Sequence, residues 1–189
     1  MIAVAGAVIF AAMIVEALLA STNERALRAA GAIEPAGDVY RIMQLAYPAC
    51  FLAMLAEGAA RSVGADAGFA IGTAVFAAGK ALKYWAIVTL GPRWTFRVLV
   101  PPGGARIRRG PYRWLAHPNY AGVAGELLGV AIAMSALLTG PFAVAGFCLL
   151  MRRRVLVEEA ALRQSRMSGT EAPASERAAA SDHANGARR

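Results

Sequence analysis

Two short stretches of this chain carry the residue types that chemistry needs. The first is GPYRWLAHPNY, residues 110–120, which holds His117 among aromatic and proline residues. The second is RRRVLVEEAAL, residues 152–162, in which Arg154 and Glu158 stand four positions apart. On a helix two such residues lie on the same face. An arginine can hold a carboxylate through paired N–H bonds, and aromatic faces attract cations, so together the stretches could bind a charged small molecule.

The local conformation of the first stretch follows from its prolines. Pro111 and Pro118 disfavour helix for the residue before each of them, so Gly110 and His117 are predicted to be extended or in turns. Pro118 suits the first turn of a helix that begins there. His117 and Tyr120 are therefore expected at the entry to the apolar segment that follows.

The apolar segment between the two stretches covers residues 120–151. It is interrupted at Thr139, Gly140 and Pro141, where glycine and proline predict a turn. We interpret it as a helical hairpin that dips into a membrane and returns, with a single long tilted helix as the alternative. A hairpin would bring both stretches to one membrane face, around one site.

The composition indicates that lipid surrounds much of the chain. Of 189 residues, 58% are hydrophobic and 17% are charged, whereas about a quarter of a soluble domain is charged. Apolar runs at residues 1–20, 40–56 and 68–90 approach the roughly 20 residues that a membrane crossing needs. With the hairpin they predict an all-α integral membrane fold of about five transmembrane segments in one domain, residues 1–165. Residues 166–189 carry few large apolar side chains and are predicted to be a disordered tail.

The basic residues predict the orientation. The loop of residues 91–119 contains no acid and six arginines: Arg93, Arg97, Arg106, Arg108, Arg109 and Arg113. Such loops stay in the cytoplasm, so residues 21–39 and the C-terminus are expected there, in an inner (plasma) membrane, with the N-terminus outside. Because the net charge of +8 gathers beside apolar segments, we expect anionic lipid headgroups as its partner and no nucleic acid.

Several residues within or beside the spans carry separate expectations. Lys80 and Lys83 are expected to snorkel toward the basic face, and Trp85 and Trp94 to anchor the membrane edge. Glu126, inside the hairpin, is either a functional acid or a structural partner of one of these lysines. Four-residue spacings that would let helices approach closely occur in two groups of glycines, at Gly64, Gly68 and Gly72 and at Gly125 and Gly129.

Other classes of protein lack their signatures here. Residues 1–20 have no positively charged region ahead of them, which favours a retained span over a cleaved signal peptide. No glycine-rich phosphate loop and no Cys/His cluster occurs, so neither a Rossmann or P-loop site nor a metal site is indicated. Cys50 and Cys148 have no motif spacing, and no signal for an oligomeric state is present.

The paired stretches resemble a known enzyme family. GPYRWLAHPNYAG followed by RVLVEEAAL, with LKYWAIVTLGPRWTFRV upstream, is similar to the isoprenylcysteine carboxyl methyltransferase family over residues 81–162. The likeness extends to its bacterial members and, more distantly, to phospholipid methyltransferases. It implies an integral membrane enzyme that uses S-adenosylmethionine without a Rossmann domain. The expected reaction methylates a carboxylate or hydroxyl of a lipid-like acceptor, with the cytoplasmic loop and a C-terminal helix covering the cofactor.

The resemblance also implies residue roles. Arg154 matches a substrate-side arginine, and Glu159 or His117 is a candidate base if the acceptor is a phenol or enol. Family members usually have arginine directly before the His-Pro dipeptide, where this chain has Ala116, so Arg113 or Arg109 would have to replace it. The positions matched to cofactor contacts are Gly104, Ala105, Arg106, Ile107, Tyr112, His117, Pro118, Asn119, Tyr120 and Glu158.

The acceptor is expected to enter from the bilayer, between the third span and the hairpin. Two rival interpretations remain open. One is an NADPH-dependent membrane reductase of the sterol-reductase kind, which has a similar HPxY stretch. The other is a non-catalytic membrane relative, for which Ala116 is the main argument.

Overall fold

The structure is a computed structural model that describes residues 1–100 and 107–171. Five α-helices make up most of it, and none of the described residues forms a β-strand, which confirms the all-helical prediction. A single isolated bridge pairs Ile33 with Val100. The elements are α1 (Ile2–Ala29), α2 (Tyr40–Ala60), α3 (Ala67–Leu90), the 3-10 helices η1 (Gly91–Arg93) and η2 (Gly110–Arg113), α4 (Pro118–Ala133) and α5 (Thr139–Glu171).

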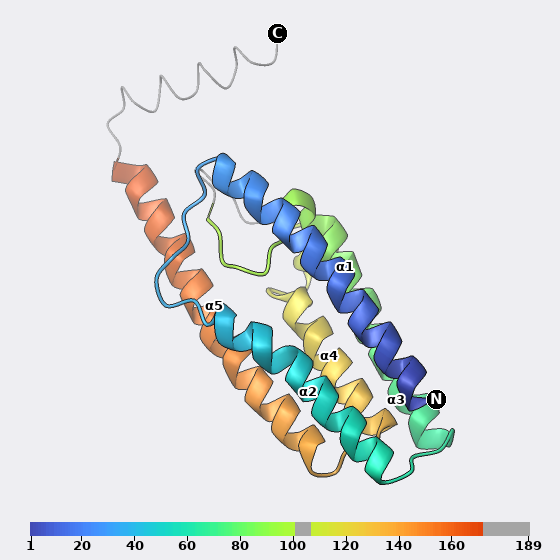
Figure 1. The fold of residues 1–189 in the computed structure, drawn as a ribbon. Helices are drawn as coiled ribbons and strands as arrows, with labels where there is room; N and C mark the ends of the chain where they lie inside the picture. Colours follow the sequence, from blue (N-terminus) through green and yellow to red (C-terminus); the bar gives the residue numbers. More distant parts are fainter. Residues whose placement is uncertain (101–106, 172–189) are drawn as a thin grey trace.

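Successive helices run in opposite directions, so the connecting segments gather at two ends (Figure 1). Residues 30–39, 91–100 and 107–117 lie at one end, which we call the site end, together with the C-terminal part of α5. The N-terminus and residues 61–66 and 134–138 lie at the opposite end. This arrangement agrees with the predicted grouping of loops on two sides, and it brings together the two stretches that carry the chemistry.

The predicted turn at Thr139, Gly140 and Pro141 is wrong. The chain reverses at residues 134–138 instead, and these three residues form the first turn of α5, where proline fits without loss of a hydrogen bond. Ser135 supplies the reversal with a φ of 46°. Glu57 of α2 then caps α5, because its carboxylate accepts from the backbone N–H groups of Leu138 (3.1 Å) and Thr139 (2.8 Å).

The remaining helix bounds extend the predicted spans. α1 ends nine residues after residue 20, at Ala29, and α2 ends at Ala60, while α3 matches the predicted 68–90 within one residue. The backbone of α5 is helical to Glu171, so it includes the first residues of the predicted tail. Residues 172–189 of that tail lie outside the described residues.

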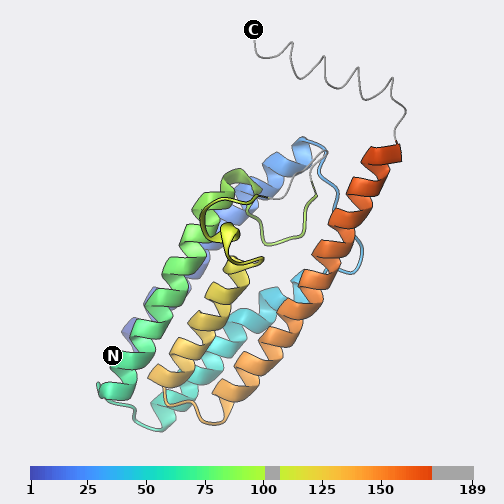
Figure 2. The same ribbon diagram turned by 180° about the vertical axis from the view of Figure 1, so that it is seen from behind.

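α3 and α4 lie side by side (Figure 2), and glycines line the contact between them. A Cβ atom on Gly72 would overlap the backbone of Ala133, and one on Gly79 would lie 2.8 Å from the backbone nitrogen of Glu126. Gly129 meets the backbone of α3 in the same way. The predicted entry of the acceptor between the third span and the hairpin is therefore wrong, because these two backbones touch.

The outer faces of the helices are apolar. Val88 of α3 is 77% exposed, Leu45 of α2 75% and Phe142 of α5 81%. Among the described helices, α1 and α2 are long and apolar enough to cross a membrane by length and composition. Apolar side chains that face outward while charged ones face inward are the pattern expected in lipid.

Four charged side chains meet in the interior, midway along the helices. Lys83 Nζ lies 2.6 Å from Glu16 and 3.5 Å from Glu126, and Lys80 Nζ lies 3.0 Å from Glu16 and 2.9 Å from Glu126. Tyr47 of α2 donates its hydroxyl hydrogen to Glu126. The predicted snorkelling of the two lysines is wrong, since both side chains turn inward and pair with buried carboxylates. Of the two roles considered for Glu126, the structural one is observed.

Candidate active site

The segment of residues 94–100 is held in place by the end of α1. The side chain of Asn23 donates to the backbone oxygen of Trp94 at 2.8 Å. Glu24 accepts from the backbone N–H of Arg97 at 3.2 Å and also lies 3.6 Å from its guanidinium. An extended segment with no helical hydrogen bonds of its own needs such partners. Two polar residues of α1 therefore fix the first half of this segment, residues 94–100, which we call the loop.

The connection between α1 and α2 fixes the second half. Glu34 pairs with Arg97 at 2.7 Å, and Asp38 accepts from the backbone N–H of Val98 at 3.0 Å. Burial acts to raise the pKa of Glu34, but hydrogen bonds from Arg28 and Arg97 outweigh it, so the pKa lies below its ordinary value of 4.5. The segment is thereby positioned between α1, α2 and α5, as Figure 1 shows.

The two predicted stretches meet at the site end. His117 precedes α4 in a non-helical conformation (φ −135°, ψ 66°), and Pro118 is the first residue of that helix, as predicted. His117 Nε2 lies 3.6 Å from Glu159, and its Nδ1 lies 4.0 Å from Glu158. Tyr120 stacks on the imidazole with ring centroids 5.6 Å apart and donates its hydroxyl hydrogen to Glu158 at 3.4 Å. The predicted convergence is confirmed.

A cavity of about 180 Å³, which we call the loop cavity, lies where these elements meet. Eight of the twelve predicted site residues line it: Ile107, Tyr112, His117, Asn119, Tyr120, Arg154, Glu158 and Glu159. The rest of its lining comes from the end of α3, η1, residues 94–100 and the residue before His117: Leu90, Arg93, Trp94, Thr95, Arg97, Val98, Leu99, Val100 and Ala116. Both charge signs, several rings and backbone groups thus face one space, which suits a zwitterionic or cationic ligand.

Burial and the nearby charge of Glu158 act together on Tyr112. They raise the pKa of its hydroxyl well above the ordinary value of 10.0. Tyr112 therefore stays protonated near neutral pH and presents a hydroxyl donor and a ring face to the loop cavity. It is not suited to act as a base there.

A second, larger cavity of about 550 Å³ lies among the helices, and we call it the helix cavity. Most of its lining is apolar and comes from α1 and α2, including Phe10, Met13, Ile14, Met43 and Pro48. It borders the loop cavity directly, because five residues line both: Trp94, Thr95, Asn119, Tyr120 and Arg154. A smaller cavity richer in charged side chains and a larger, more apolar one therefore share one wall at the site end.

Arg154 occupies the junction of the two cavities. It is buried, with 6% of its surface exposed. It reaches from α5 to donate to the backbone oxygen of Phe96, and its Nη1 lies 3.8 Å from Asp38. A fixed arginine at this point can present its N–H groups to an anionic or oxygen-bearing ligand in either cavity.

The remaining predicted site residues do not line the loop cavity. Pro118 is fully buried beneath it and serves the start of α4. Arg109 and Arg113 do not line the cavity. Neither is therefore placed to replace the family's usual arginine, whose position is taken by Ala116 here. Arg113 stacks on Trp114 instead, and Arg109 donates to the backbone of Thr89. Gly104, Ala105 and Arg106 lie outside the described residues.

Trp94 is a site residue that sequence reasoning misplaced. It is 3% exposed, lines both cavities and donates from its indole N–H to the Asn119 side chain at 3.3 Å. The expected role as a membrane-edge anchor is therefore wrong for Trp94. Trp85, by contrast, is 48% exposed and packs against the outward-facing Trp114.

Asp38 and the loop residues around Arg97 were missed altogether. The sequence did hold an indication for the loop, because the loop lies in the upstream stretch that resembles the family. It held none for Asp38, since an isolated acid in a polar connection usually remains in solvent.

A family model matches the part of the chain that carries most of these residues. Residues 70–164, about half of the chain, match the model of the isoprenylcysteine carboxyl methyltransferase (ICMT) family. The chain belongs to this family. The matched region contains most of α3, both stretches, α4 and α5 as far as residue 164.

Two bacterial proteins are similar to this member of the ICMT family over most of their length. An uncharacterised protein of Bacillus subtilis (strain 168), YpbQ, is 30% identical over 79% of this chain and 89% of its own length. An uncharacterised protein of Haemophilus influenzae is 25% identical over 74% of this chain and 82% of its own. No solved structure matches. The family, together with two helices long enough to span a bilayer, indicates an integral membrane methyltransferase.

Proposed function

We propose that this protein transfers a methyl group from S-adenosylmethionine to a carboxylate or hydroxyl of a lipid-like acceptor. The observation that carries the proposal is the shared wall between the loop cavity and the helix cavity. A methyltransferase for a lipid must bring a polar cofactor and an apolar acceptor into contact while water is kept out. Two adjoining cavities, one richer in charged side chains and one with a larger apolar lining, meet that need.

The residues around the loop cavity fit the cofactor. His117 Nε2 is buried and makes no hydrogen bond among the described residues, so a polar atom of a ligand would satisfy it. Glu158 offers a carboxylate to an ammonium or to ribose hydroxyls. The faces of Tyr112 and Tyr120 favour a sulfonium by cation–π attraction, worth about 0.5–2 kcal/mol each. Trp114, which points outward, does not take part.

Side chains near the junction of the two cavities are candidates to bind the acceptor and to remove its proton. When bound, the cofactor supplies a methyl group already activated by its sulfonium. Arg154, at the junction, holds the acceptor oxygen by its N–H groups. For an acceptor that carries a proton, such as a phenol or enol, Glu159 or His117 removes it, and their 3.6 Å separation lets them act as a pair.

The helix cavity holds the apolar body of the acceptor. Its lining by α1 and α2, with Ile14 of α1 61% exposed, favours entry beside α1. Entry between α3 and α4 is blocked by their glycine contacts. The arginines of residues 91–119 support a site end on the cytoplasmic side of the inner membrane, because basic loops tend to stay there, and the cofactor is available on that side.

Calorimetric titration of the purified protein in detergent tests the cofactor assignment. We expect binding of S-adenosylhomocysteine and none of NADPH. Glu158→Gln should weaken this binding about tenfold or more, because a hydrogen bond to a charged group contributes about 1.5–3 kcal/mol. Arg153→Gln, an exposed neighbour on α5, is the matched control and should bind as the wild type does. Binding of NADPH in place of S-adenosylhomocysteine would establish the reductase alternative.

Transfer is then measured with tritium-labelled methyl donor and three defined acceptors. N-acetyl-S-farnesylcysteine and palmitic acid offer a carboxylate, and pentadecylresorcinol offers a phenol. We expect label in at least one of them with the wild type and a large loss with Glu158→Gln. Equal labelling by both proteins would refute the site, and no labelling of any acceptor despite cofactor binding would favour the non-catalytic relative.

A further inference from the structure

Asp38, in the connection between α1 and α2, is a buried acid with three partners. Its Oδ1 accepts from the backbone N–H of Tyr40 at 3.1 Å and lies 3.8 Å from Nη1 of Arg154. Its Oδ2 accepts from the backbone N–H of Val98 at 3.0 Å. Only 5% of the side chain is exposed. One carboxylate therefore touches the start of α2, the loop and the arginine at the junction of the cavities.

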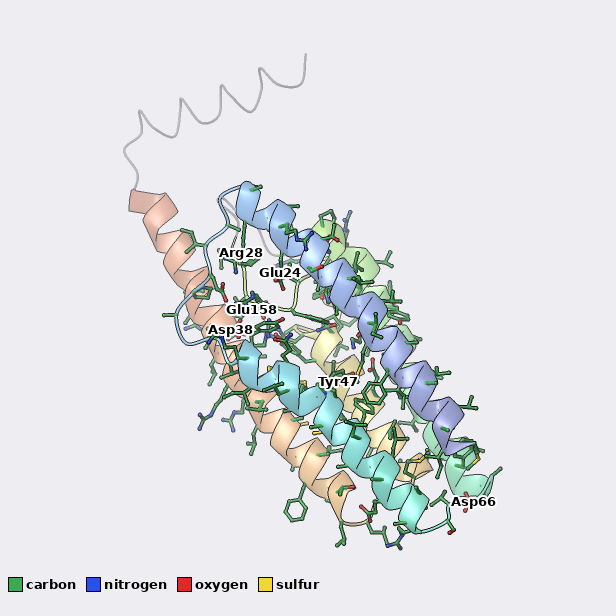
Figure 3. The ribbon with its side chains drawn as sticks, viewed as in Figure 1. Glu24, Arg28, Asp38, Tyr47, Asp66 and Glu158 are labelled. Carbon is green, nitrogen blue, oxygen red and sulfur yellow. The ribbon has the colours of Figure 1, made fainter. Side chains whose placement is uncertain are left out.

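Figure 3 shows where this acid lies. Asp38 appears beside α5 in the same region as Glu158, at the site end with Glu24 and Arg28. Tyr47 lies deeper among the helices, and Asp66 marks the opposite end. Arg154 precedes Glu158 by one helical turn on α5, and Asp38 forms an ion pair with this arginine.

The guanidinium of Arg154 is held along one edge. Nη1 faces Asp38, and Nη2 donates to the backbone oxygen of Phe96. Nε is buried and has no hydrogen-bond partner among the described residues. A buried donor left unpaired costs about 1–3 kcal/mol, so a ligand oxygen at the junction would complete the arrangement. Arg154 borders both cavities and can meet a ligand there.

We propose that Asp38 is the positioning residue for Arg154. It fixes the Nη edge of the guanidinium against the loop, and this leaves the Nε–H group for the oxygen that receives the methyl group. The inference rests on the proposed function and adds to it a residue from outside the region that matches the family model. A long, flexible arginine gains from such fixing, because a misplacement of about 1 Å at a reacting centre can lower a rate about hundredfold.

The test is Asp38→Asn, which removes the charge and keeps the size. We expect kcat/KM for the methylated probe acceptor to fall about tenfold to hundredfold. The affinity for S-adenosylhomocysteine should stay within about twofold, because Arg154 acts on the acceptor. Asp66→Asn is the matched control. Asp66 lies at the opposite end of the molecule, where it accepts from the backbone N–H of Phe69 at 2.8 Å, so this variant should retain wild-type kcat/KM.

A double variant separates positioning from general support of the fold. In an Arg154→Gln background, Asp38→Asn should cause no further loss, because the group it positions is already gone. If the two losses multiply instead, Asp38 supports the structure independently and the proposal is overturned. Should Asp38→Asn not fold, Asp38→Glu replaces it, since it keeps the charge and displaces the carboxylate by one methylene. The same loss and the same dependence on Arg154 are expected.

Failure of the proposed function gives a different result. If the wild type methylates none of the three probe acceptors, the enzyme assignment fails while Asp38 can still be tested. The four proteins of the cycle are then compared by thermal unfolding in detergent. Non-additive destabilisation supports fixing of Arg154 by Asp38, and additive destabilisation overturns it.

Discussion

Trp94 separates two roles that the sequence cannot distinguish. Both Trp85 and Trp94 lie near the end of an apolar run, and both were expected at the membrane edge. Only the loop that follows α3, folded back by Asn23 and Glu24, turns Trp94 inward to meet Asn119. The difference depends on contacts between distant parts of the chain, which no local pattern records.

The buried position of Trp94 leads to a prediction at the residue scale. Trp94→Phe removes the N–H donated to Asn119 and part of the wall shared by both cavities. We expect S-adenosylhomocysteine affinity to fall about threefold to tenfold, the loss of one ordinary hydrogen bond. Titration calorimetry measures it, and Trp85→Phe should leave the affinity unchanged. A loss confined to Trp85→Phe would show that the two residues had been assigned the wrong way round.

At the scale of elements, most helices could be predicted because apolar runs have a minimum length in a bilayer. The predicted turn was placed a few residues too late, because glycine and proline are found both in turns and in the first turn of a helix. What decided between them was Glu57, some 80 residues away, which supplies the cap. Likewise Gly129 was correctly expected to allow close approach, but its partners Gly72 and Phe76 on α3 could not be known from spacing.

The glycine contacts predict how the α3–α4 pair responds to added volume. Gly72→Ala places a methyl group against the backbone of Ala133, and overpacking of this kind costs about 1–3 kcal/mol. Gly146→Ala in α5 meets nothing within 4 Å and should instead stabilise by up to about 1 kcal/mol through helix propensity. Thermal unfolding of both variants in detergent measures the difference. Equal stability of the two would mean that α3 and α4 do not touch at Gly72.

For the whole molecule, the interior charges explain why a sparsely covered α1 stays in place. Only 11% of its most apolar stretch is buried, yet Glu16 joins it to Lys80 and Lys83 of α3. Asn23 adds a link to the loop. The sequence showed each charge inside a span but not their pairing, which depends on the rotation of three helices about their axes.

This network predicts a large loss of stability when one of its charged side chains is replaced with an uncharged one. Lys83→Met leaves Glu16 and Glu126 facing only Lys80, and breaking a buried ion pair in this way costs about 3–5 kcal/mol. The double variant Glu16→Gln, Lys83→Met restores neutrality and should recover much of that loss. Arg61→Gln breaks the exposed 3.9 Å pair with Glu57 and should cost less than about 1 kcal/mol. Thermal unfolding in detergent ranks the three, and a double variant less stable than Lys83→Met would contradict the account.

The wall common to the loop cavity and the helix cavity has a thermodynamic consequence. A ligand that orders Trp94, Tyr120 or Arg154 from one side prepares the surface seen from the other. If a bound cofactor raises the affinity for the acceptor by some factor, a bound acceptor must raise the affinity for the cofactor by the same factor, because the two binding equilibria are linked. Under the proposed function, the concentration of acceptor in the membrane would then set the apparent affinity of the enzyme for its methyl donor.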